Sequence, residues 1–169
     1  MQFLELVKKR YSVRGYKPDM VEDNKLKIVL EAMQFAPSAS NRQPVQFIII
    51  NTQGKKQELR KIYDRDWFIN APLLICACGL PHESWVRSDG TNYTFVDVAI
   101  AMDHLILAAT EVGLGTCWVA AFNAQELRKF LGLPEEVIPV AMTPLGYPDI
   151  EPTPKERKPL DELVRYDHW

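Results

Sequence analysis

The chain has 169 residues, which is most simply the length of one domain spanning residues 1–169. Hydrophobic residues make up 47% of it, enough for an ordinary globular core. The formal net charge of -2 at pH 7 argues against a nucleic-acid-binding protein, because such proteins usually carry a basic surplus.

The amino-terminal residues enter a charged amphipathic pattern directly, so we expect no signal peptide. The most apolar long segment, 95–109, contains Asp97, Asp103 and His104, and it is too short to span a bilayer. We therefore expect a soluble cytoplasmic protein with no membrane partner.

The three cysteines have neither zinc spacing nor a Cys-x-x-Cys motif, and the three histidines are scattered along the chain. The residues are Cys76, Cys78, Cys117, His82, His104 and His168. Buried free thiols are favoured over a redox role, and no metal site is expected.

Hydrophobic periodicity predicts alternating helices and strands in the first half of the chain. The expected elements are a helix that ends near Arg10, a helix over 22–35 stopped by Pro37, a buried strand over 45–50, a surface helix over 54–63 and a strand over 73–78. A polar loop is expected over 81–92.

A helix is predicted over 94–112, and it is apolar nearly all round, which requires burial on nearly all sides. Two arrangements would satisfy this requirement. The helix lies either at a subunit interface or at the centre of a compact monomer.

The last third of the chain predicts a strand over 115–120, a helix from a capping box of Asn123 and Glu126 to about Leu131, and a strand over 137–143. Pro139 indicates that this last strand is an edge strand or has an interrupted ladder. After Gly146 the chain is rich in proline, so we expect a tail with little regular structure that wraps over another surface.

Two polar segments carry the candidate chemistry. Residues 10–14 (Arg-Tyr-Ser-Val-Arg) offer two guanidinium groups and a hydroxyl, which suit phosphate oxygens, although a solvated basic helix end is the alternative. Residues 36–44 form a turn-rich loop whose side chains can hydrogen-bond a polar ring or a sugar-like chain. Together they indicate a phosphorylated cofactor with a long polar body.

Other nucleotide and catalytic motifs are absent from the sequence. The Gly113-Leu114-Gly115 turn follows a helix, and Trp118 stands where a dinucleotide fingerprint needs glycine. There is no P-loop, and no serine lies in a nucleophile-elbow context.

The ordered set of motifs resembles the FMN-dependent nitroreductase family. Residues 10–14 resemble its Arg-x-Ser-x-Arg motif, and 36–47 resemble its Ala-Pro-Ser-x-x-Asn-x-Gln-Pro-Trp-x-Phe motif, with Val45 in place of tryptophan. Residues 108–118, 145–148 and 157–160 resemble the family's central helix with its following strand and its carboxy-terminal signature. The resemblance covers the chain from residue 10 to residue 160.

This resemblance implies an α+β fold, a three-layer α/β/α sandwich with a mostly antiparallel central sheet, built as an intertwined homodimer. It implies FMN as cofactor and NADH or NADPH as co-substrate, with no metal. By resemblance, the FMN phosphate would be held by Arg10, Ser12, Arg14 and Arg157. The ribityl chain and ring would be lined by Ser38, Ala39, Asn41 and Gln43 from the opposite subunit, and the ring would be faced by Cys117, Trp118, Val119 and Gly146. Further cofactor-binding residues would be Tyr11, Pro37 and Lys155.

The implied activity is transfer of reducing equivalents from NAD(P)H to a small oxidant such as a nitroaromatic, a quinone or a flavin, by a ping-pong mechanism. No side chain is assigned as a catalytic acid or base, because the flavin carries the redox chemistry. The alternatives are an FMN-storage module and a related enzyme of different chemistry, such as dehalogenation or flavin fragmentation. The short 64–94 region and Val45 leave the substrate class open.

Overall fold

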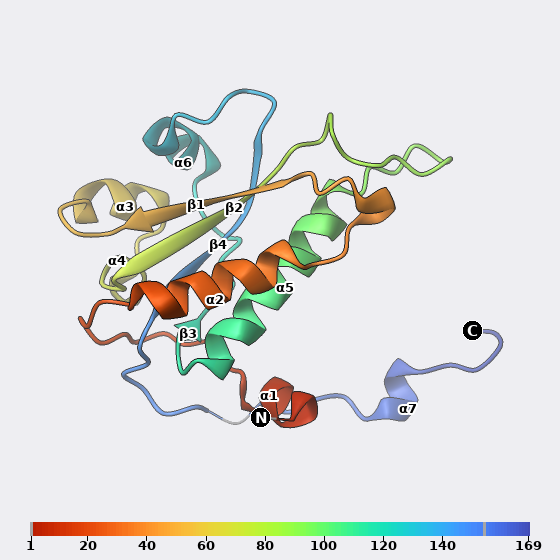
Figure 1. The fold of residues 1–169 in the computed structure, drawn as a ribbon, viewed down its shortest axis with the longest axis horizontal. Coiled ribbons are helices and arrows are strands. Elements are labelled where there is room, and N and C mark those ends of the chain that lie inside the picture. The colour runs from red at the N-terminus through yellow and green to blue at the C-terminus, as the bar shows by residue number, and fades with distance from the viewer. Residues whose placement is uncertain (1, 154) are drawn as a thin grey trace.

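A computed structural model describes residues 2–153 and 155–169 as an α+β fold around one antiparallel sheet (Figure 1). The strands are β1 (Val45–Asn51), β2 (Leu73–Gly79), β3 (Gly115–Thr116) and β4 (Ile138–Gly146), in the spatial order β1-β2-β4-β3. The helices are α1 (Phe3–Lys9), α2 (Asp23–Gln34), α3 (Lys56–Ile62), α4 (Asp66–Ile69), α5 (Thr94–Glu111), α6 (Ala124–Leu131) and α7 (Leu160–Leu163), with a short 3₁₀ turn at Ala39–Asn41.

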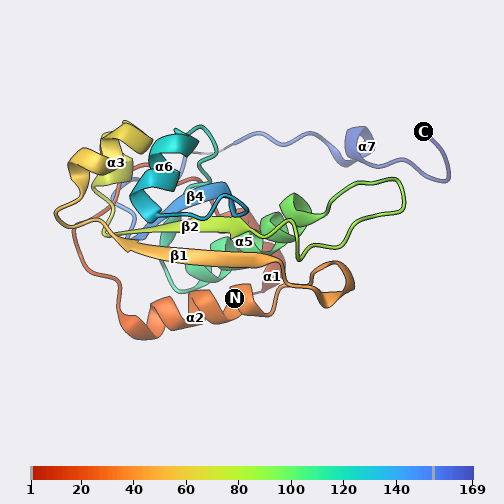
Figure 2. The ribbon, with the colours of Figure 1, turned by 90° about the horizontal axis from the view of Figure 1, so that it is seen from above.

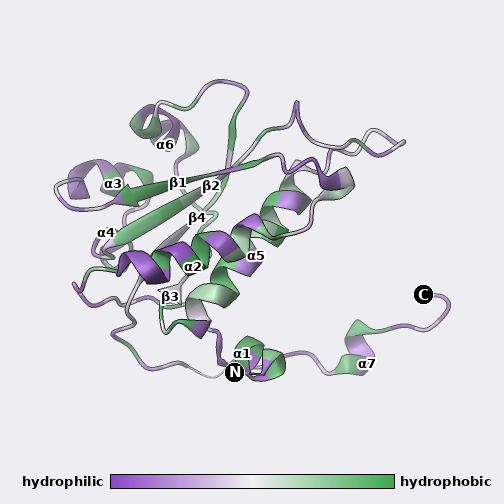
Figure 3. Ribbon diagram, in the orientation of Figure 1, coloured by the Kyte–Doolittle hydropathy of each residue, from purple (hydrophilic) through white to green (hydrophobic). Residues whose placement is uncertain are grey.

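Helices cover both faces of the sheet and create two separate cores, so the predicted α/β/α layers are confirmed (Figure 2). One core joins the sheet to α3, α4 and α6, and the other joins it to α2 and α5. The hydropathy of the elements suits this arrangement (Figure 3). Hydrophobic and hydrophilic residues alternate along α2, as expected for a helix with one buried face, whereas the strands β1 and β2 are mostly hydrophobic. In the part of the chain that the structure describes, none of the helices has the length and apolarity to cross a membrane.

The positions of β1 and β4 in the sheet differ from the prediction. The 45–50 segment was expected to be a buried strand, but β1 lies at the edge of the sheet, and Ile50 is its one buried residue. Conversely, β4 lies between β2 and β3, although Pro139 favoured an edge. The other expectation for Pro139 is confirmed, because the β2–β4 register shifts between Ala77 and Cys78, opposite this proline.

The connection between α5 and α6 is less regular than predicted. Gly113, with a φ of +81°, turns the chain out of α5, and the Leu114 N–H donates to the Ala109 carbonyl across the turn. The expected strand over 115–120 pairs with β4 only at β3, and Val119 forms an isolated bridge with Met142. The Asn123 side chain caps α6 as expected, accepting from the Gln125 and Glu126 N–H groups, but the Asn123 N–H donates to the Ile62 carbonyl rather than to a capping-box glutamate.

One flank of α5 stays open in the single chain. Phe95 and Val96 are 56% and 45% exposed, and with Ala99, Ile100, Asp103 and His104 they line a shallow cavity of about 530 Å³. The helix is therefore not fully buried by its own chain. The segment that carries α7 likewise extends away from the body, and α7 is a single turn that the sequence did not predict (Figure 1).

Thr143 ties β4 to the segment that follows β3. Its fully buried hydroxyl accepts from the Cys117 N–H at 3.0 Å and donates to the Pro144 carbonyl at 2.9 Å. We predict that Thr143→Val lowers the free energy of unfolding by about 1–3 kcal/mol, because it leaves the Cys117 N–H buried without this acceptor. Urea denaturation measures the change.

Thr110→Val is the matched control, because the Thr110 hydroxyl donates to the Ile106 carbonyl within α5 and no N–H depends on it. A smaller loss is expected for this variant. Equal losses in the two variants would contradict the role assigned to Thr143.

Candidate functional site

An extended segment after α1 presents the predicted arginine and serine side chains. α1 ends at Lys9, and the chain then runs beside β3, where the Val13 N–H donates to the Thr116 carbonyl and Ser12 forms a parallel bridge with Thr116. Val13 points into the core, so its neighbours Ser12 and Arg14 point to the other side. The sequence pattern Arg-x-Ser-x-Arg therefore places its polar side chains on one side of an extended strand.

The end of α1, this segment and the tail enclose a basic cavity of about 700 Å³. Its lining residues are Val7, Lys8, Lys9, Arg10, Tyr11, Ser12, Pro152, Thr153, Lys155 and Arg157. Among these described residues none is acidic, and the hydroxyls of Ser12 and Thr153 stand among the cations. The Tyr11 hydroxyl donates to the Ile150 carbonyl at 2.8 Å, which holds the start of the tail against the cavity. Such a donor set suits a phosphate dianion.

The environment of the Cys117 thiol shows that Arg14 belongs to the same region, although Arg14 does not line the cavity. Burial raises the pKa of Cys117, and the charge of Arg14, the Ser12 hydroxyl and the charges of Lys155 and Arg10 act in the opposite direction. These groups therefore lie close enough to the thiol to influence it. The Arg14 guanidinium also lies 6.0 Å from the ring centroid of Trp67 in α4, a cation–π contact that orients it.

The predicted ring-binding segment lies beside this cluster and is firmly held. The Cys117 N–H donates to Thr143, and Val119 exchanges backbone hydrogen bonds with Met142 at 2.8 and 2.9 Å. Trp118, between these two buried residues, is 40% exposed. Gly146 ends β4, where a Cβ atom would lie 2.7 Å from the Pro72 side chain, so close packing accounts for the glycine. The roles of these residues at a flavin ring stay predictions.

The loop over 36–44 lies at a different cavity, of about 740 Å³, between α2, α5 and β1. Pro37, Ser38 and Gln43 line it, and Ala39 and Asn41 belong to the same loop. The two cavities have no lining residue in common. The single chain therefore brings the predicted site residues together in two groups, one around the basic cavity and one on this loop.

Sequence reasoning missed four contributors to these two groups. Lys8 and Lys9 line the basic cavity, and their position in the last turn of the predicted helix beside Arg10 is a signal that could have revealed them. Trp67 lies far from Arg14 along the sequence, so no local pattern joins them. Asp97 lines the loop cavity from α5.

Among the described residues, no group of three or more histidine, cysteine, aspartate or glutamate side chains is arranged to hold a metal ion. The buried Cys76 and Cys78 thiols lie 3.6 Å apart on β2. This hydrogen-bonded contact raises the pKa of Cys76 and lowers the pKa of Cys78.

Comparison with known proteins gives a consistent family. The family model of the Nitroreductase family matches residues 7–65 and 55–147. A crystal structure of a nitroreductase family protein from Clostridium difficile 630 is 38% identical over all of both chains, with a TM-score of 0.92. An FMN reductase (NAD(P)H) of Bacillus subtilis is 28% identical over 90% of this chain and 68% of its own, and an iodotyrosine deiodinase of Thermotoga neapolitana is 29% identical over 96% of each.

The basic cavity generates a prediction about anions. We expect inorganic phosphate to raise the melting temperature of the flavin-free protein, because a ligand that binds only the folded state stabilises it. Arg157→Ala should reduce this shift by half or more, since it removes one of the cavity's charged donors. Thermal unfolding with increasing phosphate, against chloride at matched ionic strength, measures both effects.

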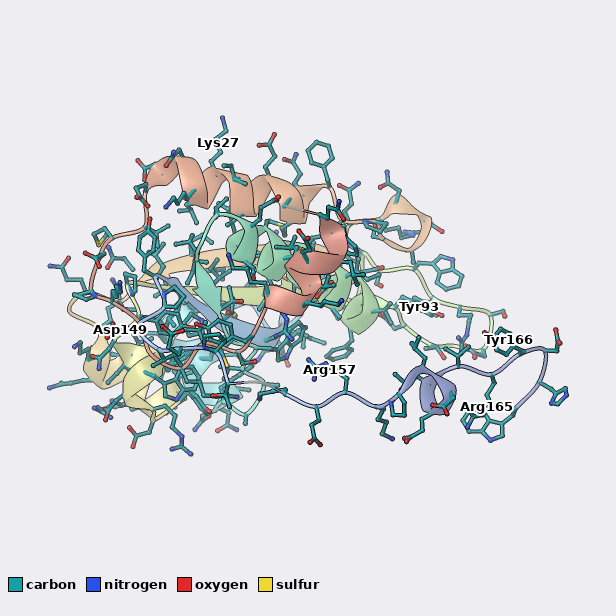
Figure 4. The ribbon with its side chains drawn as sticks, turned by 90° about the horizontal axis from the view of Figure 1, so that it is seen from below. Lys27, Tyr93, Asp149, Arg157, Arg165 and Tyr166 are labelled. Atoms are coloured by element: carbon teal, nitrogen blue, oxygen red, sulfur yellow. The ribbon has the colours of Figure 1, made fainter. Side chains whose placement is uncertain are left out.

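Arg165→Ala is the control, because Arg165 lies farther out on the tail, whereas Arg157 lies near the point where the tail leaves the body (Figure 4). Arg165→Ala should keep the full phosphate-induced rise in melting temperature. If the rise is the same in Arg157→Ala and Arg165→Ala, the tail acts only through its overall charge and the specific role of Arg157 is contradicted.

Proposed function

The chain belongs to the nitroreductase family, and from this premise we propose that it is an FMN-dependent oxidoreductase that moves reducing equivalents from NADH or NADPH to a small oxidant. The observation that carries this proposal is the basic cavity, where Arg10, Lys155 and Arg157 converge with the Ser12 hydroxyl. This donor set fits the terminal phosphate of FMN in charge and in hydrogen-bonding capacity.

When bound, FMN supplies the hydride-transfer chemistry, and the chain's own residues bind and orient it. Arg10, Arg14 and Ser12 would hold the phosphate at the end of the extended segment, while Lys155 and Arg157 close over it from the tail. The backbone of residues 117–119 would lie along the ring. Its hydrogen bonds to Thr143 and Met142 use the N–H groups of Cys117 and Val119 and give this segment a fixed geometry, so the Trp118 N–H between them would need no rearrangement to face the ring.

The experiment that tests the proposal is the visible spectrum of the purified protein. We expect a flavin spectrum that NADH or NADPH bleaches and that a nitroaromatic or a quinone restores. Cofactor released by heat should run as FMN on a column. A yellow protein that neither pyridine nucleotide reduces would be an FMN-storage module, and a protein that binds no flavin would contradict the proposal outright.

Dehalogenation is the second candidate, because one of the similar proteins is named an iodotyrosine deiodinase. The same reduced protein distinguishes the two candidates. Reoxidation by a nitroaromatic or quinone supports the first, whereas reoxidation by a halogenated tyrosine with release of halide supports the second.

We also propose that the active form is a homodimer. Pro37, Ser38, Ala39, Asn41 and Gln43 would then complete the flavin site of the partner subunit, which agrees with the separation of the two cavities within one chain. The open flank of α5 and the exposed apolar residues of the tail would be buried between the subunits. Those tail residues are Leu160, Leu163, Val164, Tyr166 and Trp169.

We predict that the protein sediments at twice the 19.4 kDa of one chain even at nanomolar concentration, because obligate interfaces are large and apolar. Ile100→Asp should yield the monomer and weaken flavin binding, since it places a charge in the apolar flank of α5. Lys61→Asp, an exposed change on α3, should leave the dimer intact. A flavin-loaded wild-type monomer would remove the shared-site arrangement.

A further inference from the structure

The loop from Ser38 to Gln43 has an unusual backbone for residues that carry side chains. Ser40, Asn41 and Gln43 all have left-handed conformations, with φ of 53°, 51° and 53°. Such conformations cost free energy for residues other than glycine, and asparagine tolerates them best. The surrounding structure must therefore hold the loop in this shape.

Several hydrogen bonds inside the loop help to fix it. The Asn41 N–H donates to the Ser38 carbonyl at 3.0 Å, and the Gln43 N–H donates to the Ser38 hydroxyl at 2.9 Å. The Gln43 side-chain amide donates to the Asn41 carbonyl at 3.1 Å. These bonds close the loop on itself, but they do not attach it to the rest of the molecule.

Asp97 supplies the attachment. Its Oδ1 accepts the Ala39 N–H at 2.9 Å, which joins the loop to the first turns of α5. Within the part of the chain that the structure describes, the other hydrogen bonds of residues 38–43 join the loop to itself or to Val45. One buried acceptor thus links this loop to the core helix.

Burial of the Asp97 carboxylate costs free energy of folding. Asp97 is 2% exposed, and among the described residues its Oδ2 is the buried side-chain oxygen or nitrogen atom without a hydrogen-bond partner. A buried carboxylate with one hydrogen bond has lost water without full replacement. A residue selected for stability alone would be apolar here, as its neighbours Val98 and Ala101 on α5 are.

We infer that Asp97 is a positioning residue for the loop 38–43: its carboxylate holds the Ala39 backbone so that Ser38, Asn41 and Gln43 keep the geometry in which they meet the flavin. The inference rests on the proposed function for the identity of that ligand. The bond to Ala39 and the strained conformation belong to the chain itself. Asp97 acts through the loop backbone and is not assigned a contact with the cofactor.

A structural role at the start of α5 is the competing explanation, because carboxylates near a helix amino terminus are stabilised by the helix dipole. The two explanations predict different behaviour for Asp97→Val, which removes the acceptor and the charge. A helix-stabilising aspartate would change the melting temperature and leave the loop as it is. A positioning aspartate would change the loop while the melting temperature stays the same or rises.

Arg42 provides a probe of the loop that needs no cofactor, because it is exposed, lies inside the loop and is a trypsin site. We expect flavin-free Asp97→Val to be cut after Arg42 about tenfold faster than the wild-type protein, as the loss of a charge-assisted hydrogen bond would allow. Mass spectrometry identifies the cut. Asp97→Asn keeps an acceptor oxygen and should be cut at an intermediate rate, so it tests the same point if the valine variant does not fold.

Glu58→Gln is the control, because Glu58 is an exposed carboxylate on α3, which packs on the other face of the sheet, and it should be cut at the wild-type rate. Cutting of Asp97→Val and Asp97→Asn at the wild-type rate, or a lower melting temperature without faster cutting at Arg42, would overturn the inference.

Titration of the flavin-free proteins with FMN, followed by fluorescence quenching, provides the second measurement. The Kd of Asp97→Val should rise about tenfold or more, and Asp97→Asn should recover part of the affinity. If the wild-type protein binds FMN and Asp97→Val binds it equally well, the inference fails and the proposed function stands. If the wild-type protein binds no FMN, the proposed function fails, and the cutting rates still decide whether Asp97 holds the loop.

Discussion

The burial of β2 on both faces is the constraint on which the other elements depend. Every residue of this strand is buried, and its side chains alternate between the two cores: Leu74, Cys76 and Cys78 on one side, Leu73, Ile75 and Ala77 on the other. The backbone of β2 is paired on both edges, with β1 and β4. Helices must therefore cover both faces of the sheet. Pairing with β2 also fixes the position of β4, whose residues Thr143 and Gly146 lie beside the segment proposed to hold the flavin.

Local patterns predicted most of this fold because the strongest signals belong to single elements. The 3.6-residue period of α2, the apolar length of α5 and the buried run of β2 each lie within a short stretch of sequence. The errors in the placing of strands within the sheet concern β1 and β4. An apolar run fits an edge strand as well as a central one, and a proline can be absorbed by a register shift, so only pairing with distant strands decides which place each strand takes.

The residues of the candidate site also fall into those that local sequence patterns identify and those that only the structure reveals. Arg10, Ser12 and Arg14 could be chosen from the sequence because they offer two guanidinium groups and a hydroxyl within five residues, and Arg157 because it begins a segment that resembles a family signature. The convergence of Arg10, Ser12 and Arg157 on one cavity depends on the chain's path in space. Asp97 was noted in the sequence only as a charge that interrupts an apolar helix, because nothing local shows that the loop at residue 39 lies beside residue 97.

The two halves of the proposed site are held by different kinds of interaction, and this difference has consequences for how each can change. The basic half consists of cations on an extended segment and on the exposed tail, whose attraction for a phosphate weakens with salt and tolerates the exchange of one cation for another. The loop half is strained and is attached to a core helix through the carboxylate of Asp97, which is 2% exposed. Its geometry depends on Asp97, a buried residue of the core helix α5, rather than on a surface side chain. Affinity for the phosphate can therefore vary through surface substitutions, whereas the position of the loop is fixed by the core.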